Sequence, residues 1–539
     1  MPERPGRTSP ILPAEFVRAA GRGMSDDADP LAIGASGKGR GSGAAPGVRS
    51  GRGARIRGRL RAQLRSERIG LALALLACLA PGAAILVMIV VLVAQGSLAS
   101  GHFWTLLVRP RVLPVERSDR DADRALVFSV HVATCDEPPA LVIATLESLD
   151  AQINPPDFEV IVMDNNTADP AVWHPVRDWC RGRRRFRFLH RDRVEGAKAG
   201  ALNIAFAATH PKATHVVVVD ADYQLTPDFL ALAAGALRRH RADFVQFPQA
   251  YRSAEPAAGV VLELSDYFTR HARFADAADA MLLTGTLSVI DRRALAAADG
   301  WSAATLTEDA ALGLRLRALG YHGRLDSRVG GHGLLPLDFA ALERQRYRWA
   351  AGNLASLGDI AQLPSRTAAH VFAQLTAWTN LALPAAACLA GGWAHLMYAD
   401  GAAGAGSARL LVELATLCLG LIIVSAVIPL AACVSRAGVR AVVAASATRI
   451  ALVPSAARGT IDGLFGTAGA FQRTPKSPKQ ARDSLPFHLA ALALLGATML
   501  ADPAGVPLAR LGAVLLIAPA ASFLLTSRHL ANYRAALAS

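Results

Sequence analysis

The sequence predicts an α/β domain with a mostly parallel sheet, on the cytoplasmic side, inserted between transmembrane α-helices. Between residues 125 and 350, short β-rich runs alternate with Ala- and Leu-rich helical stretches, a pattern typical of βαβ units. Long apolar runs lie on both sides of that region, and the 539-residue chain is 52% hydrophobic and only 19% charged. Soluble proteins usually carry about 25% charged residues, so this composition favours a membrane protein.

The central region supplies the predicted strands and helices. The β-rich runs lie at 126–132, 158–163 and 215–219, and the helical stretches include 199–208 and 310–319. In an open parallel sheet, ligands bind beyond the carboxyl ends of the strands. We therefore expect the chemistry of this chain to lie where these three strands end.

The residues before the central region form two segments of different character. Residues 1–69 are rich in Gly, Arg, Pro and Ser without apolar periodicity, which predicts a disordered basic arm. Residues 70–108 contain no Asp, Glu, Lys or Arg and are interrupted by Pro81. A span needs about 20 apolar residues, so this run is long for one span and short for two. A hairpin of two short helices, which the basic arm favours, and one kinked span both fit.

Four apolar runs follow the central region, near 371–398, 408–434, 485–501 and 507–526. The connection between the second and third runs is basic, as is the tail, and basic segments are retained on the cytoplasmic face. Four spans thus place the central domain in the cytoplasm, at the cell inner membrane. The predicted order is an interfacial helix at 351–370, two spans in 371–434, a cytoplasmic interfacial segment at 435–484, two spans in 485–526 and a cytoplasmic tail at 527–539.

The positive charge of the chain is confined to two segments. The net charge is +14, and residues 1–69 hold 14 basic against 6 acidic residues while residues 434–484 hold 8 against 2. These segments account for the whole excess, so the rest of the chain is neutral. A nucleic-acid binder carries basic residues across its folded domain. The distribution therefore argues against nucleic acid and for membrane sidedness.

Two carboxylates, Asp220 and Asp222, directly follow the valine-rich run 215–219. At this spacing both can address one hard divalent cation that keeps open positions for phosphate oxygens. The pair predicts a site for Mg²⁺ or Mn²⁺. Alone the pattern is weak, because acidic residues commonly end strands.

Further polar motifs follow the other predicted strands and open two helices. Each has a simpler interpretation: Asp164 as a turn former, Thr307 as a helix N-cap, and Arg346 with Arg348 as a solvated helix face. Their order along the chain indicates one shared crevice instead. The motifs are TCDEP at 134–138, DNNT at 164–167, KAGALN at 198–203, TED at 307–309 and QRYRW at 345–349.

Together with DAD, this series resembles that of the processive family 2 glycosyltransferases, the cellulose synthase-like membrane enzymes, over about residues 126–350. FQRTPK at 471–476 is similar to the family's gating loop FxVTPK, with Arg473 in place of Val. The resemblance implies a GT-A fold that binds a nucleotide sugar in the cytoplasm.

The resemblance also implies a role for each matching residue. One group would bind the donor, a second the acceptor, and a third would close over the diphosphate, while Asp309 would be the catalytic base. The donor group is Thr134, Glu137, Asp164, Lys198, Asp220, Gln345 and Arg348, with Asp220 and Asp222 at the metal ion; the acceptor group is Glu308 and Trp349; the gating loop contributes Phe471, Thr474 and Lys476.

The chemistry of these residue types agrees with glycosyl transfer. A positioned base that takes a proton from the acceptor hydroxyl is worth about 10²–10⁴-fold in rate. Arg348 can meet phosphate oxygens through two donors as the diphosphate leaves. Trp349 offers a flat face for a sugar ring, although it could instead anchor the chain at the membrane interface. A single direct displacement inverts the anomeric centre.

We therefore expect an inverting hexosyltransferase that uses a UDP-sugar, UDP-glucose first among them, processively builds a β-glycan and exports it. Its partners are the UDP-sugar, the polysaccharide acceptor and the lipid bilayer, with export proteins left open. Trp378, Asn380, Trp393, His395 and Glu413 are candidates to line an exit path through the spans. Transfer of one sugar to a lipid is the nearest alternative, and a catalytically silent export scaffold is the alternative of another class.

Two departures from the family keep the product open. The segment 283–287 reads LTGTL, without the cysteine that cellulose synthases have there. We also expect no cyclic-di-GMP-binding domain after the last apolar run. Another β-glucan or hexose polymer is as well supported as cellulose.

Overall fold

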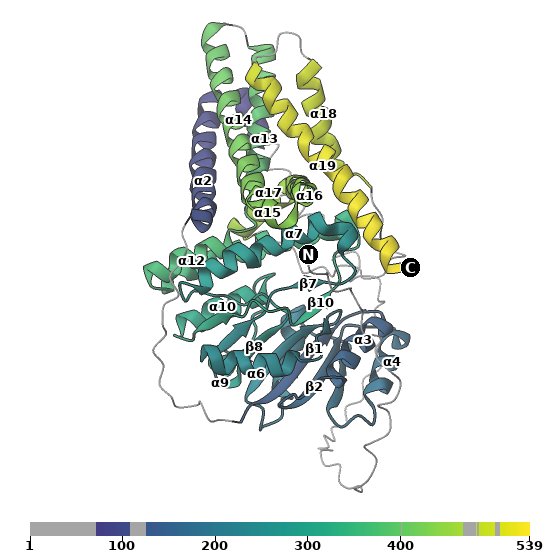
Figure 1. Ribbon diagram of the computed structural model, residues 1–539. Coiled ribbons are helices and arrows are strands. Elements are labelled where there is room, and N and C mark those ends of the chain that lie inside the picture. Colours follow the sequence, from purple (N-terminus) through teal and green to yellow (C-terminus); the bar gives the residue numbers. More distant parts are fainter. Residues whose placement is uncertain are drawn as a thin grey trace, which may run out of the picture. The chain divides into compact units, whose positions relative to one another are not determined.

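The computed structural model describes residues 72–107, 125–399, 401–466, 481, 484–501 and 507–538. An α/β domain forms its central part, and apolar helices from both sides of the sequence pack together beyond one end of that domain (Figure 1). The predicted arm at 1–69 and the predicted gating loop at 471–476 lie outside the described residues.

The central domain is built on a seven-stranded sheet in the order β3-β2-β1-β4-β8-β6-β9. The first four strands are parallel to one another, whereas β8 runs antiparallel to both β4 and β6. The sheet is mostly parallel, which confirms the predicted fold class. The strands are β1 Val127–Thr134, β2 Asp157–Asn165, β3 Phe186–Arg191, β4 His215–Asp220, β6 Phe244–Gln246, β8 Ser288–Asp291 and β9 Gly323–Leu325.

Helices cover both faces of this sheet, which explains the valine-rich sequence of β4. Val217 and Val219 are buried in a cluster with α3 and α6, and Val216 and Val218 in a cluster with α5, α9 and α10. Successive residues of a strand point to opposite faces, so a strand that is covered twice is apolar at every position. The helices are α3 Pro139–Asp150, α5 Ala197–Ala207, α6 Phe229–His240, α9 Arg292–Ala297 and α10 Glu308–Ala318.

A second, three-stranded sheet lies in the order β5-β10-β7. Its strands are β5 Gln224–Leu225, β7 Ala250–Tyr251 and β10 Gly331–Gly333. β10 pairs antiparallel with β5, which closely follows the DAD motif. The small sheet therefore holds the residues after β10 close to Asp222.

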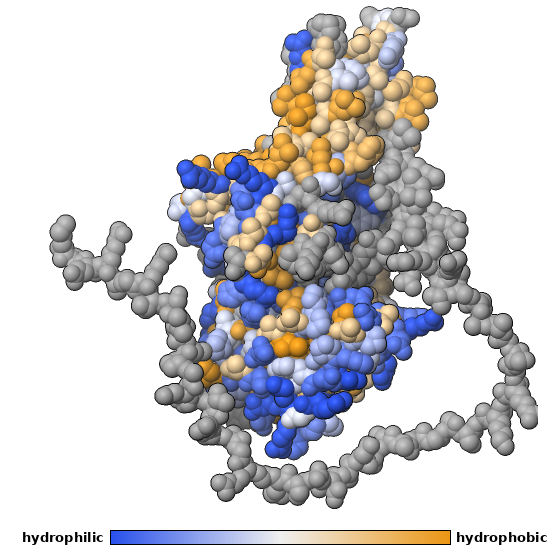
Figure 2. Space-filling view, turned by 90° about the vertical axis from the view of Figure 1, so that its right-hand side faces the viewer, coloured by the Kyte–Doolittle hydropathy of each residue, from blue (hydrophilic) through white to orange (hydrophobic). Residues whose placement is uncertain are grey.

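Three segments of the described chain are long and apolar enough to cross a membrane: Pro81–Gly101, Gly404–Ala431 and Gly512–Ala538. A fourth is formed if α16 and α17, bent by 45°, are one span. Figure 2 shows apolar side chains over this helical bundle and polar side chains over the central domain. The helices are α2 Pro81–Leu107, α13 Ala382–Tyr398, α14 Ala402–Ala431, α16 Val439–Ala451, α17 Val453–Leu464, α18 Phe487–Ala501 and α19 Pro507–Ala538.

The predicted spans agree only in part with the observed helices. The run 507–526 falls within α19, and the run 408–434 extends three residues beyond the end of α14 at Ala431. The run 485–501 contains α18, which has only 15 residues. The run 371–398 is divided between the end of α12 and α13, because the helix is broken between Leu375 and Ala382. In the run 70–108, a helix at 72–79 ends before Pro81 and α2 follows. The choice between hairpin and kinked span depends on the preceding residues and stays a prediction.

Two segments differ from their expected form. In place of one interfacial helix at 351–370, α11 (Phe339–Ala355) ends first, and a 3₁₀ turn at Leu357–Gln362 and α12 (Ser365–Leu375) follow. Pro364 separates the last two, since proline lacks the N–H that a continuing helix needs. The predicted tail at 527–539 continues α19 as helix to Ala538.

α17 packs directly on α11 through two glycines one turn apart. A Cβ atom at Gly459 would lie 2.6 Å from the Tyr347 carbonyl oxygen, and one at Gly463 would lie 2.6 Å from the Ala351 carbonyl oxygen. Only glycine allows backbones to approach this closely. α17 thus fixes the position of α11, the helix that carries the QRYRW motif.

We expect Gly459→Ala to lower the unfolding free energy by about 1–3 kcal/mol, because the added methyl group overpacks the α11–α17 contact. The matched control is Gly420→Ala, also within a helix, where an added Cβ meets nothing within 4 Å. The control should be neutral or slightly stabilising, since alanine favours helix over glycine. Thermal unfolding of the detergent-solubilised proteins measures both, and equal melting temperatures for the two variants would contradict the packing argument.

Candidate active site

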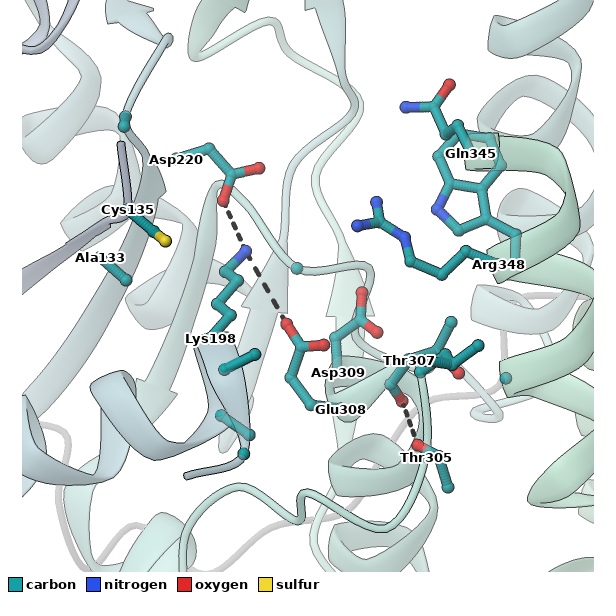
Figure 3. A pocket seen from close by; sticks show the side chains of 18 of the residues that line it. Ala133, Cys135, Lys198, Asp220, Thr305, Thr307, Glu308, Asp309, Gln345 and Arg348 are labelled. Atoms are coloured by element: carbon teal, nitrogen blue, oxygen red, sulfur yellow. Dashed lines mark hydrogen bonds and ion pairs between the residues drawn. The ribbon is translucent and has the colours of Figure 1, made fainter. Parts of the chain in front are cut away.

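A cleft of about 1420 Å³ opens where β1, β2 and β4 end, as the parallel sheet predicts. Its opposite wall comes from the start of α10 and from one face of α11 (Figure 3). The structure brings ten of the predicted site residues to this one cleft. They are Thr134, Glu137, Lys198, Asp220, Asp222, Glu308, Asp309, Gln345, Arg348 and Trp349.

Asp164 lies beneath the cleft and does not line it. Its side chain is almost fully buried, and its carboxylate accepts hydrogen bonds from the hydroxyls of Thr134 (2.8 Å) and Thr167 (2.9 Å). Its second oxygen lies 2.8 Å from His190 Nδ1. Asp164 thus joins the ends of β1, β2 and β3, and its neighbour Asn165 lines the cleft.

Four charged side chains meet at the centre of the cleft. Lys198 Nζ, on the first turn of α5, lies 2.5 Å from Asp220 Oδ1 and 3.8 Å from Glu308 Oε1 (Figure 3). Burial by itself lowers the pKa of Lys198, but Asp220, Glu308 and Asp309 outweigh it, and this pKa lies above its usual value. Lys198 therefore stays charged and reduces the repulsion between the carboxylates.

Asp309 is a carboxylate of the cleft whose acidity is strongly reduced. Burial, and then the neighbouring charge of Glu308, raise the pKa of Asp309 to about 7, while Lys198 and Arg348 oppose the shift. A carboxylate with a pKa near neutral is suited to accept a proton at physiological pH. Asp309 thus has the acidity that a general base requires.

Two glycines allow the cleft to close tightly around Asp309. Gly285 has a φ of +89°, and a Cβ there would lie 3.0 Å from Asp309 Oδ2. A Cβ at Gly352 of α11 would lie 2.7 Å from the backbone nitrogen of Thr307. Because these two residues have no side chain, the segment at Gly285, the start of α10 and α11 can all lie close to the Asp309 carboxylate.

Asp220 and Asp222 are the residues that could hold a divalent cation. In the described part of the chain, no group of three or more His, Cys, Asp or Glu side chains has the arrangement of a metal cage. Mg²⁺ is commonly bound by one or two carboxylates together with substrate phosphates and water. Two carboxylates at the end of β4, facing a cleft large enough for a nucleotide, fit that mode.

α11 presents two different faces. Gln345, Arg348 and Trp349 face the cleft, whereas Arg346 points away from it and is 4% exposed. Arg346 Nη2 lies 2.8 and 2.7 Å from the two carboxylate oxygens of Glu263, which is fully buried. The interpretation of Arg346 as part of a solvated face is therefore wrong, because its charge is neutralised inside the protein.

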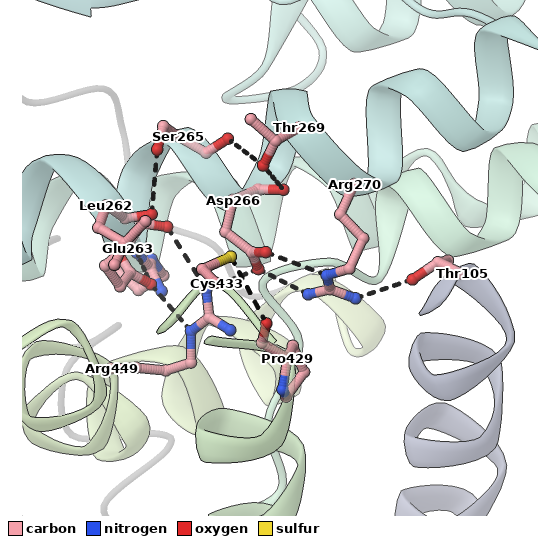
Figure 4. A network of polar contacts seen from close by, with 11 residues as sticks. Thr105, Leu262, Glu263, Ser265, Asp266, Thr269, Arg270, Pro429, Cys433 and Arg449 are labelled. Atoms are coloured by element: carbon pink, nitrogen blue, oxygen red, sulfur yellow. Dashed lines mark hydrogen bonds and ion pairs between the residues drawn. The ribbon is translucent and has the colours of Figure 1, made fainter. Parts of the chain in front are cut away.

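The Glu263 carboxylate belongs to a larger network that reaches the membrane helices (Figure 4). Arg449 of α16 contacts both Glu263 (3.3 Å) and Asp266 (2.8 Å). Asp266 also pairs with Arg270, which donates to the Thr105 hydroxyl near the end of α2. The two acidic residues lie on α7 (Ala258–Asp266), so α7, α11, α16 and α2 are linked through buried charges.

Two of the candidate exit-path residues have clear surroundings. The rings of Trp378 and Trp349 are 4.9 Å apart, so aromatic surface continues from the cleft toward α13. Glu413 lies 2.9 Å from Arg409, one helical turn away on the same helix, α14.

Sequence reasoning missed two polar residues of the cleft, Tyr223 and Thr284, whereas it had predicted Gln345 at the donor and Thr307 within the TED motif. Among the described residues, Tyr223 Oη, Thr284 Oγ1, Thr307 Oγ1 and Gln345 Oε1 are buried without a hydrogen-bond partner. Thr307 occupies the N-cap position of α10, but its hydroxyl makes no capping bond. Thr284 lies in the LTGTL segment, whose sequence alone shows no acceptor or donor pattern. All four residues line the cleft.

Comparison with known proteins agrees with this site. Residues 129–297 match the family described as Glycosyl transferase family 2, and residues 215–436 match Glycosyl transferase family group 2. The chain therefore contains a family 2 glycosyltransferase domain with a GT-A-like fold, which confirms the resemblance of its motifs.

More particular similarities are to enzymes of β-glycan synthesis, and the chain is homologous to them. It is 28% identical over 232 residues to the cellulose synthase catalytic subunit (UDP-forming) of Pseudomonas fluorescens, covering 41% of this chain and 30% of that protein. It is 29% identical over 205 residues to glucomannan 4-beta-mannosyltransferase 7 of Arabidopsis thaliana, covering 35% of this chain and 36% of that protein. The match thus spans about a third of the length of these relatives.

Among solved structures, the chain is similar to the mannosyltransferase PcManGT from Pyrobaculum calidifontis in complex with GDP-Man and Mn²⁺. The identity is 18% and the TM-score 0.46, over 71% of this chain and 99% of that chain.

We expect Glu263→Gln to destabilise the protein by about 3–5 kcal/mol, because it leaves the buried Arg346 charge without its partner. The matched control is Asp178→Asn, which removes the carboxylate of an exposed pair with Arg177 and should leave the stability nearly unchanged, because solvent screens exposed ion pairs. Thermal or chemical unfolding of the purified proteins measures both. A loss in Glu263→Gln as small as that in Asp178→Asn would contradict the role of the buried pair.

Proposed function

We propose that this chain is a membrane-embedded, inverting glycosyltransferase that transfers a hexose from a UDP-sugar, UDP-glucose first among them, to a growing β-glycan. Transfer is processive and coupled to export of the polymer. The observation that carries the proposal is Asp309, a half-buried carboxylate whose pKa is raised to about 7, facing the same cleft as Asp220, Asp222 and Trp349.

Asp309 acts as the base. It accepts the proton of an acceptor hydroxyl as the hydroxyl oxygen bonds to the anomeric carbon of the donor sugar. The bond between that carbon and the diphosphate oxygen breaks in the same step, on the opposite side of the carbon. A single displacement inverts the anomeric centre, so an α-linked donor yields a β-linked product.

Cationic side chains stabilise the negative charge that develops on the leaving diphosphate. Arg348 lies on the cleft face of α11, and Lys198 lies between Asp220 and Glu308. Such preorganised groups stabilise charge where it develops. A divalent cation at Asp220 and Asp222 would neutralise further charge on the diphosphate when bound. Phe471, Thr474 and Lys476 belong to the proposed gating loop, outside the described residues.

The remaining walls of the cleft suit a carbohydrate. Trp349 presents an aromatic face, and the unpartnered hydroxyls of Tyr223, Thr284 and Thr307 require ligands that both donate and accept hydrogen bonds. Buried polar groups without partners cost free energy, so binding of sugar hydroxyls recovers it. Thr134 and Glu137 at the end of β1, together with Asp164 through its hold on Thr134, form the nucleoside side.

The membrane helices and the charge pattern support the proposed location. The basic residues in 434–484 and in the arm support a GT-A domain on the cytoplasmic face of the inner membrane, because basic segments are retained on that face. A silent export scaffold would have no use for a half-buried base beside three other charged groups. Transfer of a single sugar to a lipid is the alternative, and analysis of the reaction product in the experiment below would reveal it.

The central experiment is sugar transfer by the purified protein in nanodiscs, with radiolabelled UDP- and GDP-hexoses and Mg²⁺ or Mn²⁺. We expect one donor to yield polymer and nucleoside diphosphate. Asp309→Asn should lower transfer by at least about 10²-fold while nucleotide binding is retained, because only the proton acceptor is lost. No transfer with any donor would end the proposal, and undiminished turnover in Asp309→Asn would refute the assignment of the base.

The acidity of Asp309 gives a separate prediction. The base works deprotonated, so kcat/KM should fall as pH drops through an apparent pKa of about 7. The charge of Glu308 raises this pKa, so Glu308→Gln should move the acidic limb to lower pH. Glu255→Gln, an exposed site away from the cleft, should leave the limb in place. A limb that does not move in Glu308→Gln would contradict the electrostatic origin of the shift.

A further inference from the structure

The C-terminal end of α19 lies against the segment that follows β10. The Leu335 backbone N–H donates a hydrogen bond to the Tyr533 hydroxyl at 3.2 Å, and Arg534 Nη1 donates to the Leu337 carbonyl oxygen at 2.6 Å. Tyr533 is completely buried. Residues 334–337 are thus held by two consecutive residues of the last helix.

The same segment reaches the cleft in the other direction. The Leu334 backbone N–H donates to Asp222 Oδ2 at 3.2 Å, and Leu334, Leu335 and Pro336 line the cleft wall. Adjacent N–H groups in an extended chain point to opposite sides. One peptide therefore holds the Asp222 carboxylate while the next is held by Tyr533.

Packing supports this link. Tyr533 and Phe523 of α19 share a buried cluster with Leu335 and with Phe339, the first residue of α11. The rings of Phe339 and Phe523 meet edge to face at 4.9 Å. The end of α19 therefore contacts both the segment at Asp222 and the start of the helix that carries QRYRW.

We propose that Tyr533 is a positioning residue of the transferase site, which holds the Asp222 carboxylate in place through Leu335 and Leu334. This inference rests on the proposed function, in which Asp222 serves the cation and the diphosphate. Tyr533 touches neither donor nor acceptor and acts only through the segment it holds. Because α19 includes the candidate span Gly512–Ala538, the seating of the last membrane helix is transmitted to the cleft.

The test is Tyr533→Phe, which removes the hydroxyl and keeps the ring. The matched control is Tyr398→Phe, the same change at a residue that is 85% exposed. UDP binding to the full-length protein in nanodiscs is titrated with MnCl₂. We expect the Mn²⁺ concentration for half-maximal UDP binding to rise about fivefold in Tyr533→Phe, the loss of about one hydrogen bond. Without a cation, Tyr533→Phe should bind UDP as the wild type does. Tyr398→Phe should match the wild type with and without Mn²⁺.

A purely structural role would weaken UDP binding equally with and without Mn²⁺, and this result, like an unchanged Mn²⁺ requirement, would overturn the proposal. Arg534→Gln provides a second variant in case Tyr533→Phe does not fold. It should shift the Mn²⁺ requirement in the same direction, with the exposed Arg528→Gln as its control.

Amide hydrogen exchange separates this inference from the proposed function. Peptides covering 333–338 should exchange faster in Tyr533→Phe than in the wild type without any nucleotide present. If the wild type binds no UDP, the proposed donor fails while the exchange result still decides whether Tyr533 holds the segment. Unchanged exchange in Tyr533→Phe would overturn the positioning role.

Discussion

The buried pair of Glu263 and Arg346 determines where α11 can lie. A charge inside a protein is tolerated only next to its counter-charge, because the cost of leaving water is otherwise not recovered. Arg346 immediately follows Gln345 on α11, and Glu263 is also bound by Arg449 of α16. The cleft face of α11 is therefore oriented by contacts on its opposite face, which extend through Asp266 and Arg270 to α2.

The cleft and this network differ in how completely their charges are compensated by neighbouring opposite charges. Glu263 is shared by two guanidinium groups, whereas the half-buried Asp309 lies beside a second carboxylate, Glu308, and is only partly compensated by Lys198 and Arg348. Full compensation holds a charge permanently and gives rigidity. Incomplete compensation leaves a carboxylate that exchanges its proton near neutral pH, as a base in transfer chemistry must. The difference between structural and reactive carboxylates is thus a difference in their neighbours.

Periodicity in the sequence was sufficient to predict β1, β2, β4, α5 and α10. Polar motifs after the strands and on the helices predicted ten residues that line one cleft. These features follow from local patterns. The position of Asp164 depends on Thr134, Thr167 and His190, and the burial of Arg346 depends on a partner 83 residues away. Pairing at such distances leaves no mark in composition or spacing. The division of the run 371–398 was missed because apolar content alone does not show where a helix breaks.

The order of the chain has a consequence for biosynthesis. The GT-A domain is translated before most of the membrane helices, yet three of its supports come after the first of them: Arg449, the Gly459–Gly463 face of α17, and Tyr533 near the end of the chain. A ribosome-bound chain therefore has the strands and carboxylates of the site before it has the contacts that hold them. The cleft therefore gains these contacts only after α16, α17 and α19 have been synthesised and have docked, so assembly of the helical bundle precedes completion of the site.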